Sequence, residues 1–187
     1  MTKNNLIAYA VVALLFGATG AYVGINKKEP GPPLTTTIAP TGGEPHAPVS
    51  AMFAQSMNDA GGAPQALSQW KGKALVVNFW APWCAPCVKE MPDLDALATE
   101  NAGKNLQVIG IGIDSPANIA QFASKFKISY PLYVAGLSGT DLARQFGNSA
   151  GGLPYTVLIG ADGQVKKTYM GLLKFDQLKA DMAALGL

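Results

Sequence analysis

The amino-acid sequence predicts an α/β sandwich with a mixed central sheet, and three observations lead to this prediction. Two short apolar runs rich in β-forming residues, 74–80 and 106–114, have the composition of buried strands. A stretch with helical periodicity lies between them, as expected when a helix connects two strands of one sheet. Near the carboxyl end, residues 155–171 contain a strand, an Asp162-Gly163 turn and a second strand, which is the pattern of an antiparallel hairpin.

The other elements can be assigned in chain order. Residues 88–103 have the apolar spacing of a helix that ends at Gly103. Ser115 can cap the next helix, with Pro116 in its first turn. The inner face of that helix is predicted to carry Ile119, Phe122 and Phe126. The rest of the domain is predicted to contain a short strand at 130–135, a helix at 139–147 and a closing amphipathic helix at 174–186.

An uncharged apolar run, residues 6–25, precedes this domain. As a helix it would be roughly 30 Å long, about the thickness of the hydrocarbon core of a bilayer. The run is either a membrane anchor or a cleavable signal peptide, for which Ala18 and Gly20 supply small residues at cleavage-like spacing. Its length, and the two lysines that follow it at once, favour one membrane helix within residues 1–28.

A proline-rich segment, residues 29–50, connects this run to the domain. It contains six prolines and almost no large apolar side chains, so it cannot bury enough surface to offset the entropy of ordering. We therefore expect a flexible tether at 29–50 and the folded domain at 51–187. The only histidine of the chain, His46, falls in the tether. A formal net charge of only +2, with no long basic run, gives little support to nucleic-acid binding.

The two cysteines, Cys84 and Cys87, are separated by two residues, a spacing found in several kinds of site. Tetrahedral zinc needs two further Cys or His ligands, and the folded domain has none. Covalent haem attachment needs a histidine directly after the second cysteine, where this chain has Val88. A structural disulfide of this spacing would close a very small loop and add little stability. The pair is therefore better placed for chemistry than for stability.

A reactive dithiol fits the surroundings of the pair. Cys84 follows a buried strand and begins a helix, where free backbone N–H groups and the helix dipole favour the thiolate. Pro86 suits the first helical turn, where its missing N–H costs nothing. Cys87 lies one turn further in and should be shielded. We therefore expect Cys84 to be the exposed attacking thiol and Cys87 the buried resolving thiol.

The stretch "NFWAPWCAPC", followed by "EMP", resembles the thioredoxin superfamily, and more closely its TlpA/ResA branch. The resemblance covers roughly residues 51–187. It implies a thioredoxin-like three-layer α/β/α sandwich, and Pro92 matches the family's proline within the active-site helix. Members of this branch are tethered or exported bacterial thiol–disulfide reductases, some of which serve cytochrome c maturation.

A second part of the resemblance lies far from the cysteines, in "GLPYTVLIGADGQV". By this match Pro154 is the family's cis-proline, close to the cysteines in space, where it would keep metal ions off the thiols. The backbone of Leu153 would pair with a substrate strand. Trp83, beside Cys84, is expected to be a contact platform for partners, and Pro86 belongs to the same substrate-facing surface.

One polar position departs from many thioredoxins, because Asn78 stands in the strand where they have a buried aspartate. A carboxylate occurs instead at Glu90, on the same helical face as Cys87. It matches the glutamate that governs thiol titration in the TlpA/ResA branch. A nearby negative charge raises the pKa of a thiol, and a protonated carboxyl can return the proton. The alternative is that Glu90 is an ordinary solvated residue on the helix surface.

Together these features predict a protein disulfide reductase that works without a bound cofactor, through a redox-active Cys84–Cys87 disulfide. The expected location is the bacterial inner membrane, with the catalytic domain in the periplasm. Apocytochrome c and proteins that assemble oxidase copper sites are equally suitable substrates. The family resemblance implies a transmembrane carrier of the DsbD or CcdA type as the electron donor. The alternatives are a disulfide-forming oxidase and a non-enzymatic copper chaperone.

Overall fold

The computed structural model describes residues 47–187. In chain order the elements are α2 (Ala47–Phe53), β1 (Ser56–Asp59), β2 (Pro64–Ala66), the 3₁₀ helix η1 (Leu67–Trp70), β3 (Ala74–Trp80), α3 (Ala85–Glu100), β4 (Leu106–Gly112), α4 (Pro116–Phe126), β5 (Leu132–Val134), α5 (Ser138–Gln145), β6 (Tyr155–Ile159), β7 (Val165–Met170) and α6 (Phe175–Ala184). The predicted apolar run at residues 6–25 lies outside these residues. Within the described part of the chain, no helix is long and apolar enough to cross a membrane.

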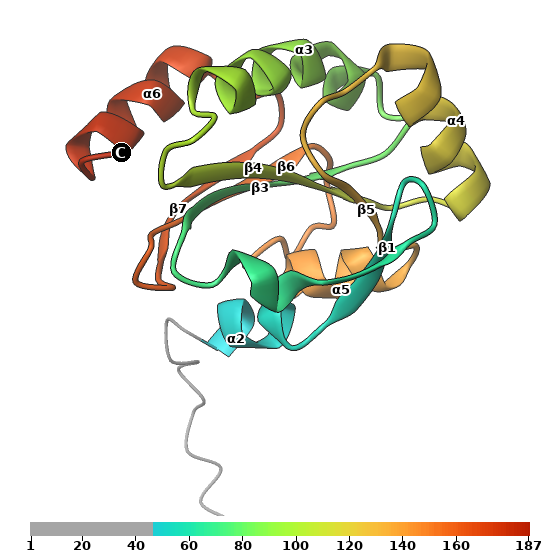
Figure 1. Ribbon diagram of the computed structural model, residues 1–187, viewed down its shortest axis with the longest axis horizontal. Helices are drawn as coiled ribbons and strands as arrows, with labels where there is room; N and C mark the ends of the chain where they lie inside the picture. The colour runs from blue at the N-terminus through green and yellow to red at the C-terminus, as the bar shows by residue number, and fades with distance from the viewer. Residues whose placement is uncertain (1–46) are drawn as a thin grey trace, which may run out of the picture. The chain divides into compact units, whose positions relative to one another are not determined.

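One mixed sheet forms the middle layer, with strand order β2-β1-β5-β4-β3-β6-β7. The strands β3, β4 and β5 are parallel, whereas β6 is antiparallel to both β3 and β7. Helices cover both faces: α3 and α6 lie above the sheet in Figure 1, and α2 and α5 lie below it. The predicted thioredoxin-like α/β sandwich with a mixed sheet is therefore confirmed for the described residues.

Two hydrophobic clusters fill the spaces between the layers. Alternate residues of β3 point to opposite faces, as the pleat requires. Val76 and Trp80 join the cluster under α3, α4 and α6, whereas Val77 and Phe79 join the cluster over α2 and α5. All seven residues of β3 are buried, so this strand is the centre of the fold.

The amino-terminal part of the domain differs from the prediction. The helix α2 begins at Ala47, and Val49 is only 2% exposed, so residues 47–50 belong to the domain and not to a flexible tether. The short strands β1 and β2 and the helix η1 were not predicted. β1 and β2 have three or four residues each with mostly exposed side chains, and such segments carry little periodic signal.

Two helices also depart in detail from the predicted pattern. The helix α3 ends at Glu100, and a turn leads to Gly103 in a positive-φ conformation. On α4, Ile119 and Phe122 are buried as predicted, but Phe126 is 45% exposed and stacks on Phe122 with ring centroids 4.3 Å apart. Phe126 is the last residue of the helix, and Lys127 turns the chain with a positive φ, so this ring covers the edge of the core.

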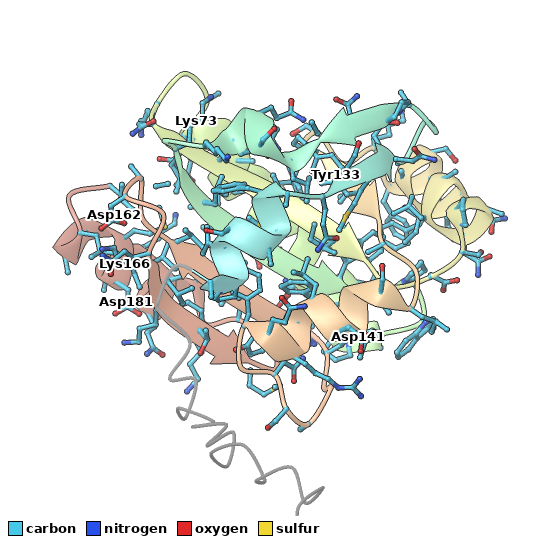
Figure 2. The ribbon with its side chains drawn as sticks, turned by 90° about the horizontal axis from the view of Figure 1, so that it is seen from below. Lys73, Tyr133, Asp141, Asp162, Lys166 and Asp181 are labelled. Atoms are coloured by element: carbon cyan, nitrogen blue, oxygen red, sulfur yellow. A yellow bond between two sulfur atoms is a disulfide. The ribbon has the colours of Figure 1, made fainter. Side chains whose placement is uncertain are left out.

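Three of the four ion pairs among the described residues involve the β6–β7 hairpin or the last helix, and the fourth, Arg144–Asp141, lies within α5. Lys166 pairs with Asp162 at 2.6 Å, and Lys167 pairs with Asp181 of α6 at 3.2 Å. Figure 2 shows Asp162, Lys166 and Asp181 close together on this part of the molecule. Exposed pairs of this kind contribute little to stability, and we assign them no part in the site.

Candidate active site

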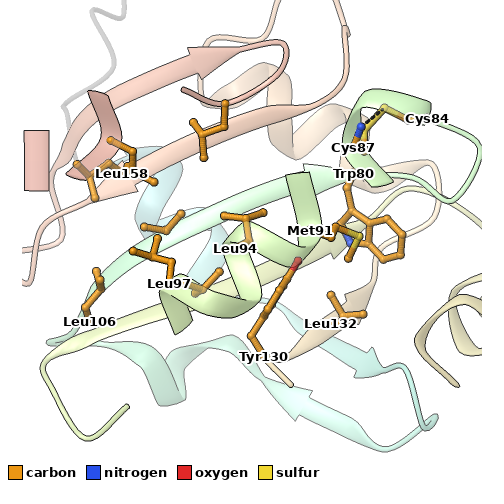
Figure 3. Packing of buried hydrophobic residues seen from close by; sticks show 14 of the residues in the cluster. Trp80, Cys84, Cys87, Met91, Leu94, Leu97, Leu106, Tyr130, Leu132 and Leu158 are labelled. Atoms are coloured by element: carbon orange, nitrogen blue, oxygen red, sulfur yellow. Dashed lines mark hydrogen bonds between the residues drawn. A yellow bond between two sulfur atoms is a disulfide. The ribbon is translucent and has the colours of Figure 1, made fainter. Parts of the chain in front are cut away.

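The cysteines lie where β3 leads into α3. Cys84 is the N-cap of α3 and forms a disulfide with Cys87, with their Cα atoms 5.2 Å apart. The backbone N–H of Cys87 donates a hydrogen bond to Sγ of Cys84 at 3.3 Å (Figure 3). A thiolate at Cys84 would accept the same bond and would face the positive end of the helix dipole. The geometry therefore suits Cys84 as the nucleophile.

Accessibility distinguishes the two sulfurs less sharply than expected. Cys84 is 6% exposed and Cys87 is fully buried. The description of Cys84 as an exposed thiol is thus wrong for the disulfide form, although Cys84 remains the more accessible of the two. Two side chains near Cys84 lie on the surface: Trp83 is 69% exposed, and Pro86 is also exposed.

The segment before β6 has the backbone form that the resemblance implied. The peptide bond between Leu153 and Pro154 is cis. Pro154 is buried, and Leu153 is half-buried and packs against both hydrophobic clusters. The side-chain amide of Asn148, itself buried, donates to the carbonyl oxygen of Gly152 at 2.9 Å and holds this segment in place.

Glu90 is buried in the fold, with 1% of its surface exposed. Its two oxygens have separate partners: Oε1 accepts from Nδ2 of Asn78 at 2.7 Å, and Oε2 accepts from the backbone N–H of Leu173 at 2.8 Å. Burial raises the pKa of the Glu90 carboxyl above its ordinary value, although the two hydrogen bonds oppose the rise. The interpretation of Glu90 as a solvated surface residue is therefore wrong.

Two partners of this carboxylate network were not found by sequence analysis. Thr156 accepts from Nδ2 of Asn78 at 3.0 Å, and Leu173 binds Glu90 through its backbone. Asn78 and Thr156 are direct partners in the antiparallel pairing of β3 and β6. The sequence predicts both strands but not the register between them, and a backbone N–H carries no signal in residue type.

An open groove lies beside Trp83, the residue that precedes Cys84. It has a volume of about 860 Å³, and Trp83 forms one part of its wall. Leu137, at the start of α5, forms another part and is 87% exposed. Met57 and Ile113 line the same groove and are buried. The wall combines these apolar side chains with polar ones such as Asp114 and Ser115, and a groove of this kind can accept a side chain of a polypeptide substrate.

Metal ligands do not gather around the pair. Among residues 47–187, no group of three or more His, Cys, Asp or Glu side chains could hold a metal ion. Exchange between the dithiol and disulfide forms is the chemistry that the Cys84–Cys87 pair supports.

Comparison with known proteins agrees with this site. Residues 43–182 match the Redoxin family. The thiol-disulfide oxidoreductase ResA of Geobacillus thermodenitrificans is 28% identical over 132 residues, which cover 69% of this chain and 72% of that protein. ResA of Bacillus cereus is 30% identical over 124 residues, which cover 66% of this chain and 69% of that protein.

Solved structures agree in fold. A secreted disulfide oxidoreductase of Mycobacterium tuberculosis, homologous to DsbE of E. coli, superposes with a TM-score of 0.60 and 25% identity, over 72% of this chain and 98% of that one. An exposed lipoprotein thioredoxin of Streptococcus pneumoniae gives a TM-score of 0.58 and 26% identity, over 69% and 98% of the two chains. From its sequence match and its site, the chain belongs to the Redoxin family of the thioredoxin superfamily and is a thiol-disulfide oxidoreductase of the ResA type.

Proposed function

We propose that this oxidoreductase reduces disulfides in exported proteins, with its catalytic domain on the outer side of a bacterial inner membrane. The observation that carries the direction of electron flow is the buried carboxylate of Glu90, which lies one helical turn after Cys87. The secreted and lipoprotein nature of two similar proteins supports a location outside the cytoplasm. The uncharged run at residues 6–25 supports attachment to the membrane.

The direction of electron flow between this protein and its substrates depends on how strongly the thiolate of the reduced pair is stabilised. Sγ of Cys84 accepts a hydrogen bond from the backbone N–H of Cys87. Ala85 and Pro86, between the cysteines, carry no charge and no imidazole that could add to this stabilisation. A negative charge on Glu90 would oppose a thiolate in the pair. A pair whose reduced form gains little stabilisation is a weak oxidant and hence a good electron donor.

The reaction would proceed by two thiol–disulfide exchanges. The Cys84 thiolate attacks a substrate disulfide, forms a mixed disulfide and releases one substrate thiolate, which takes a proton from solvent. The Cys87 thiol then gives its proton to the Glu90 carboxylate, and the resulting thiolate attacks Sγ of Cys84. The Cys84–Cys87 disulfide forms, and the second substrate thiolate leaves and is protonated in turn. Two electrons have then passed from the enzyme to the substrate.

Substrate and electron donor would meet the same surface. Trp83, directly before Cys84, and Pro86, two residues after it, are exposed, and the backbone of Leu153, next to Pro154, would pair with a substrate strand. Apocytochrome c and proteins that assemble oxidase copper sites are the proposed substrates. Because the compartment is oxidising, a transmembrane dithiol carrier of the DsbD or CcdA type would return the pair to its reduced form.

The test of direction is the reduction potential of the Cys84–Cys87 pair, measured by equilibrating the full-length chain with glutathione buffers. The proposal predicts a potential below about −200 mV, in the range of proteins that donate electrons. A potential near that of the oxidant DsbA, about −120 mV, would instead identify a disulfide-forming oxidase. Glu90→Gln is the matched variant, and it should raise the potential because it removes the negative charge.

A further inference from the structure

The side chain of Asn78 lies at the centre of a buried polar cluster below α3. Asn78, Glu90 and Thr156 are each no more than 1% exposed. Nδ2 of Asn78 donates both to Oε1 of Glu90 and to Oγ1 of Thr156. The other carboxylate oxygen of Glu90 is held by the backbone N–H of Leu173. All three side chains are thus fixed by hydrogen bonds to one another or to the backbone.

The other end of the Asn78 amide is unsatisfied. Its Oδ1 is buried and has no hydrogen-bond partner among residues 47–187. A buried carbonyl oxygen without a partner is costly, and buried amides usually avoid it. In this orientation the cluster favours an ionised Glu90, because both carboxylate oxygens receive donors. A protonated Oε1 would place its O–H against the N–H of Asn78, which is a repulsive contact.

Reversal of the amide would remove the repulsive contact at Oε1, and it would turn Nδ2 toward the place now taken by Oδ1, which has no hydrogen-bond partner among residues 47–187. The carbonyl and amino ends of an asparagine side chain have nearly the same shape, so they can exchange places without repacking. After the exchange, Oδ1 would accept from the carboxyl O–H of Glu90 and from the hydroxyl of Thr156, which can donate as readily as it accepts. The N–H of Leu173 would stay on Oε2, so the carboxyl group need not move.

We propose that Asn78 is a positioning residue whose side-chain amide reverses each time Glu90 gains or loses a proton. The amide then supplies a donor to the carboxylate and an acceptor to the carboxyl, with Thr156 changing from acceptor to donor. The proposal rests on the proposed function in one respect, since Glu90 takes up the thiol proton of Cys87 there. In that step the proton moves from Sγ of Cys87 to Oε1 of Glu90, and it leaves Oε1 for solvent once the disulfide has formed.

Few other groups can compete for this proton. β3 and β6 contain no charged residue, so the sheet offers Glu90 no ion-pair partner. Apart from Cys87, the other titratable residues of α3 are Lys89, Asp93, Asp95 and Glu100, and none of these four is buried. Lys174, which follows Leu173, is exposed. Tyr130 is buried, and desolvation raises the pKa of its phenol, with Asp95 and Glu90 adding to the rise, so it stays neutral. Asn78 and Thr156 do not titrate near neutral pH, so Glu90 is the one side chain of the three that gains or loses a proton.

A pH titration of the full-length, isotope-labelled chain tests the proposal by NMR, with the disulfide intact so that the cysteines do not titrate. The side-chain amide signals of Asn78 should shift with the same midpoint as the carboxyl carbon of Glu90. Asn101 is the matched control. Its buried amide donates to the carbonyl of Leu97 at the far end of α3, and its signals should stay constant.

Glu90→Gln supplies a fixed mimic of the protonated acid, because its Nε2 can donate only to a reversed Asn78. At every pH, the Asn78 signals of this variant should resemble those of the wild type at low pH. If Glu90 titrates while the Asn78 signals do not move, the amide does not reverse and the proposal is wrong, even if the reduction potential supports a reductase. If the signals move together but the potential is that of an oxidase, the reversal stands and the direction of electron flow is wrong.

Discussion

Cys84 and Glu90 illustrate how the surroundings of single residues determine the chemistry. The same helix start that gives Cys84 a hydrogen bond from the N–H of Cys87 leads, one turn later, to a buried carboxylate. The first feature favours a thiolate, and the second opposes it. The balance between the two sets how readily the pair gives up electrons, and the charge of Glu90 is the contribution that a single substitution can remove.

Glu90→Gln should therefore increase the rate at which the reduced pair reacts with an alkylating reagent at neutral pH. Loss of the negative neighbour increases the thiolate fraction, and an increase of about tenfold corresponds to about 1.4 kcal/mol of interaction. The measurement is the alkylation rate as a function of pH, assigned to each cysteine by mass spectrometry. Glu100→Gln, on an exposed part of α3, is the control and should leave the rate unchanged. Equal rates for Glu90→Gln and the wild type would show that the carboxylate does not act on the thiols.

The raised pKa of Glu90 also predicts how stability depends on pH. The folded state binds this proton more tightly than the unfolded state, so its contribution to stability is fully present below the ordinary pKa of 4.5. That contribution is lost as the pH rises through the raised pKa of the folded state. The free energy of unfolding of the oxidised wild type should therefore fall relative to that of Glu90→Gln as the pH rises. The measurement is urea unfolding of both proteins over this range, and a constant difference would contradict the burial of a titrating carboxyl.

Among the elements, β3 and α3 bring the site together, and the groove beside them is bounded by the start of α5. Leu137 precedes α5, lines this groove and is 87% exposed. Trp83 forms another part of the wall of the same groove. The groove is therefore the part of the surface where a polypeptide substrate can gain apolar contacts without any change in the fold.

Leu137→Asp should raise the KM for a protein disulfide substrate by about tenfold, as expected for the loss of one good apolar contact. The rate with a small-molecule disulfide should stay the same, because the cysteines are untouched. Leu185→Asp, at the exposed end of α6, is the control for adding a charge at an apolar surface position. A similar loss with both kinds of substrate, or with both variants, would show that the groove does not bind the substrate.

The sequence predicted the strongly periodic elements and the reactive pair, and it failed where the signal is not local. β3 and β4 are mostly apolar runs, and Cys84 lies between a strand and a helix. The local sequence pattern was therefore sufficient to predict both strands and the place of the reactive pair. Burial of Glu90 depends on Leu173, a residue 83 positions later in the chain, and no periodicity on α3 alone reveals it. The helix α2 was missed because three of its seven residues, Val49, Met52 and Phe53, supply all its buried surface, and a proline precedes them.

The whole domain is a three-layer sandwich that collects distant segments at one site. Because β3 and β6 pair side by side, Phe79, five residues before Cys84, lies opposite Tyr155, the residue that follows Pro154. The carboxyl ends of the parallel strands β3 and β4 meet at the same edge, which is where open α/β sheets usually place their sites. The fold therefore presents one sulfur toward the surface and keeps the second behind the helix start.

This arrangement makes an ordered mechanism the central claim, and trapping of mixed disulfides in cells tests it most directly. Cys87→Ser should accumulate reductant-sensitive complexes through Cys84, because the first exchange is intact and the second is blocked. Cys84→Ser should trap almost nothing, because its remaining thiol is fully buried. Complexes should be counted on non-reducing gels of cells that carry each variant at equal abundance. Equal trapping by the two variants would contradict the order of attack, and trapping by neither would contradict disulfide exchange with protein substrates.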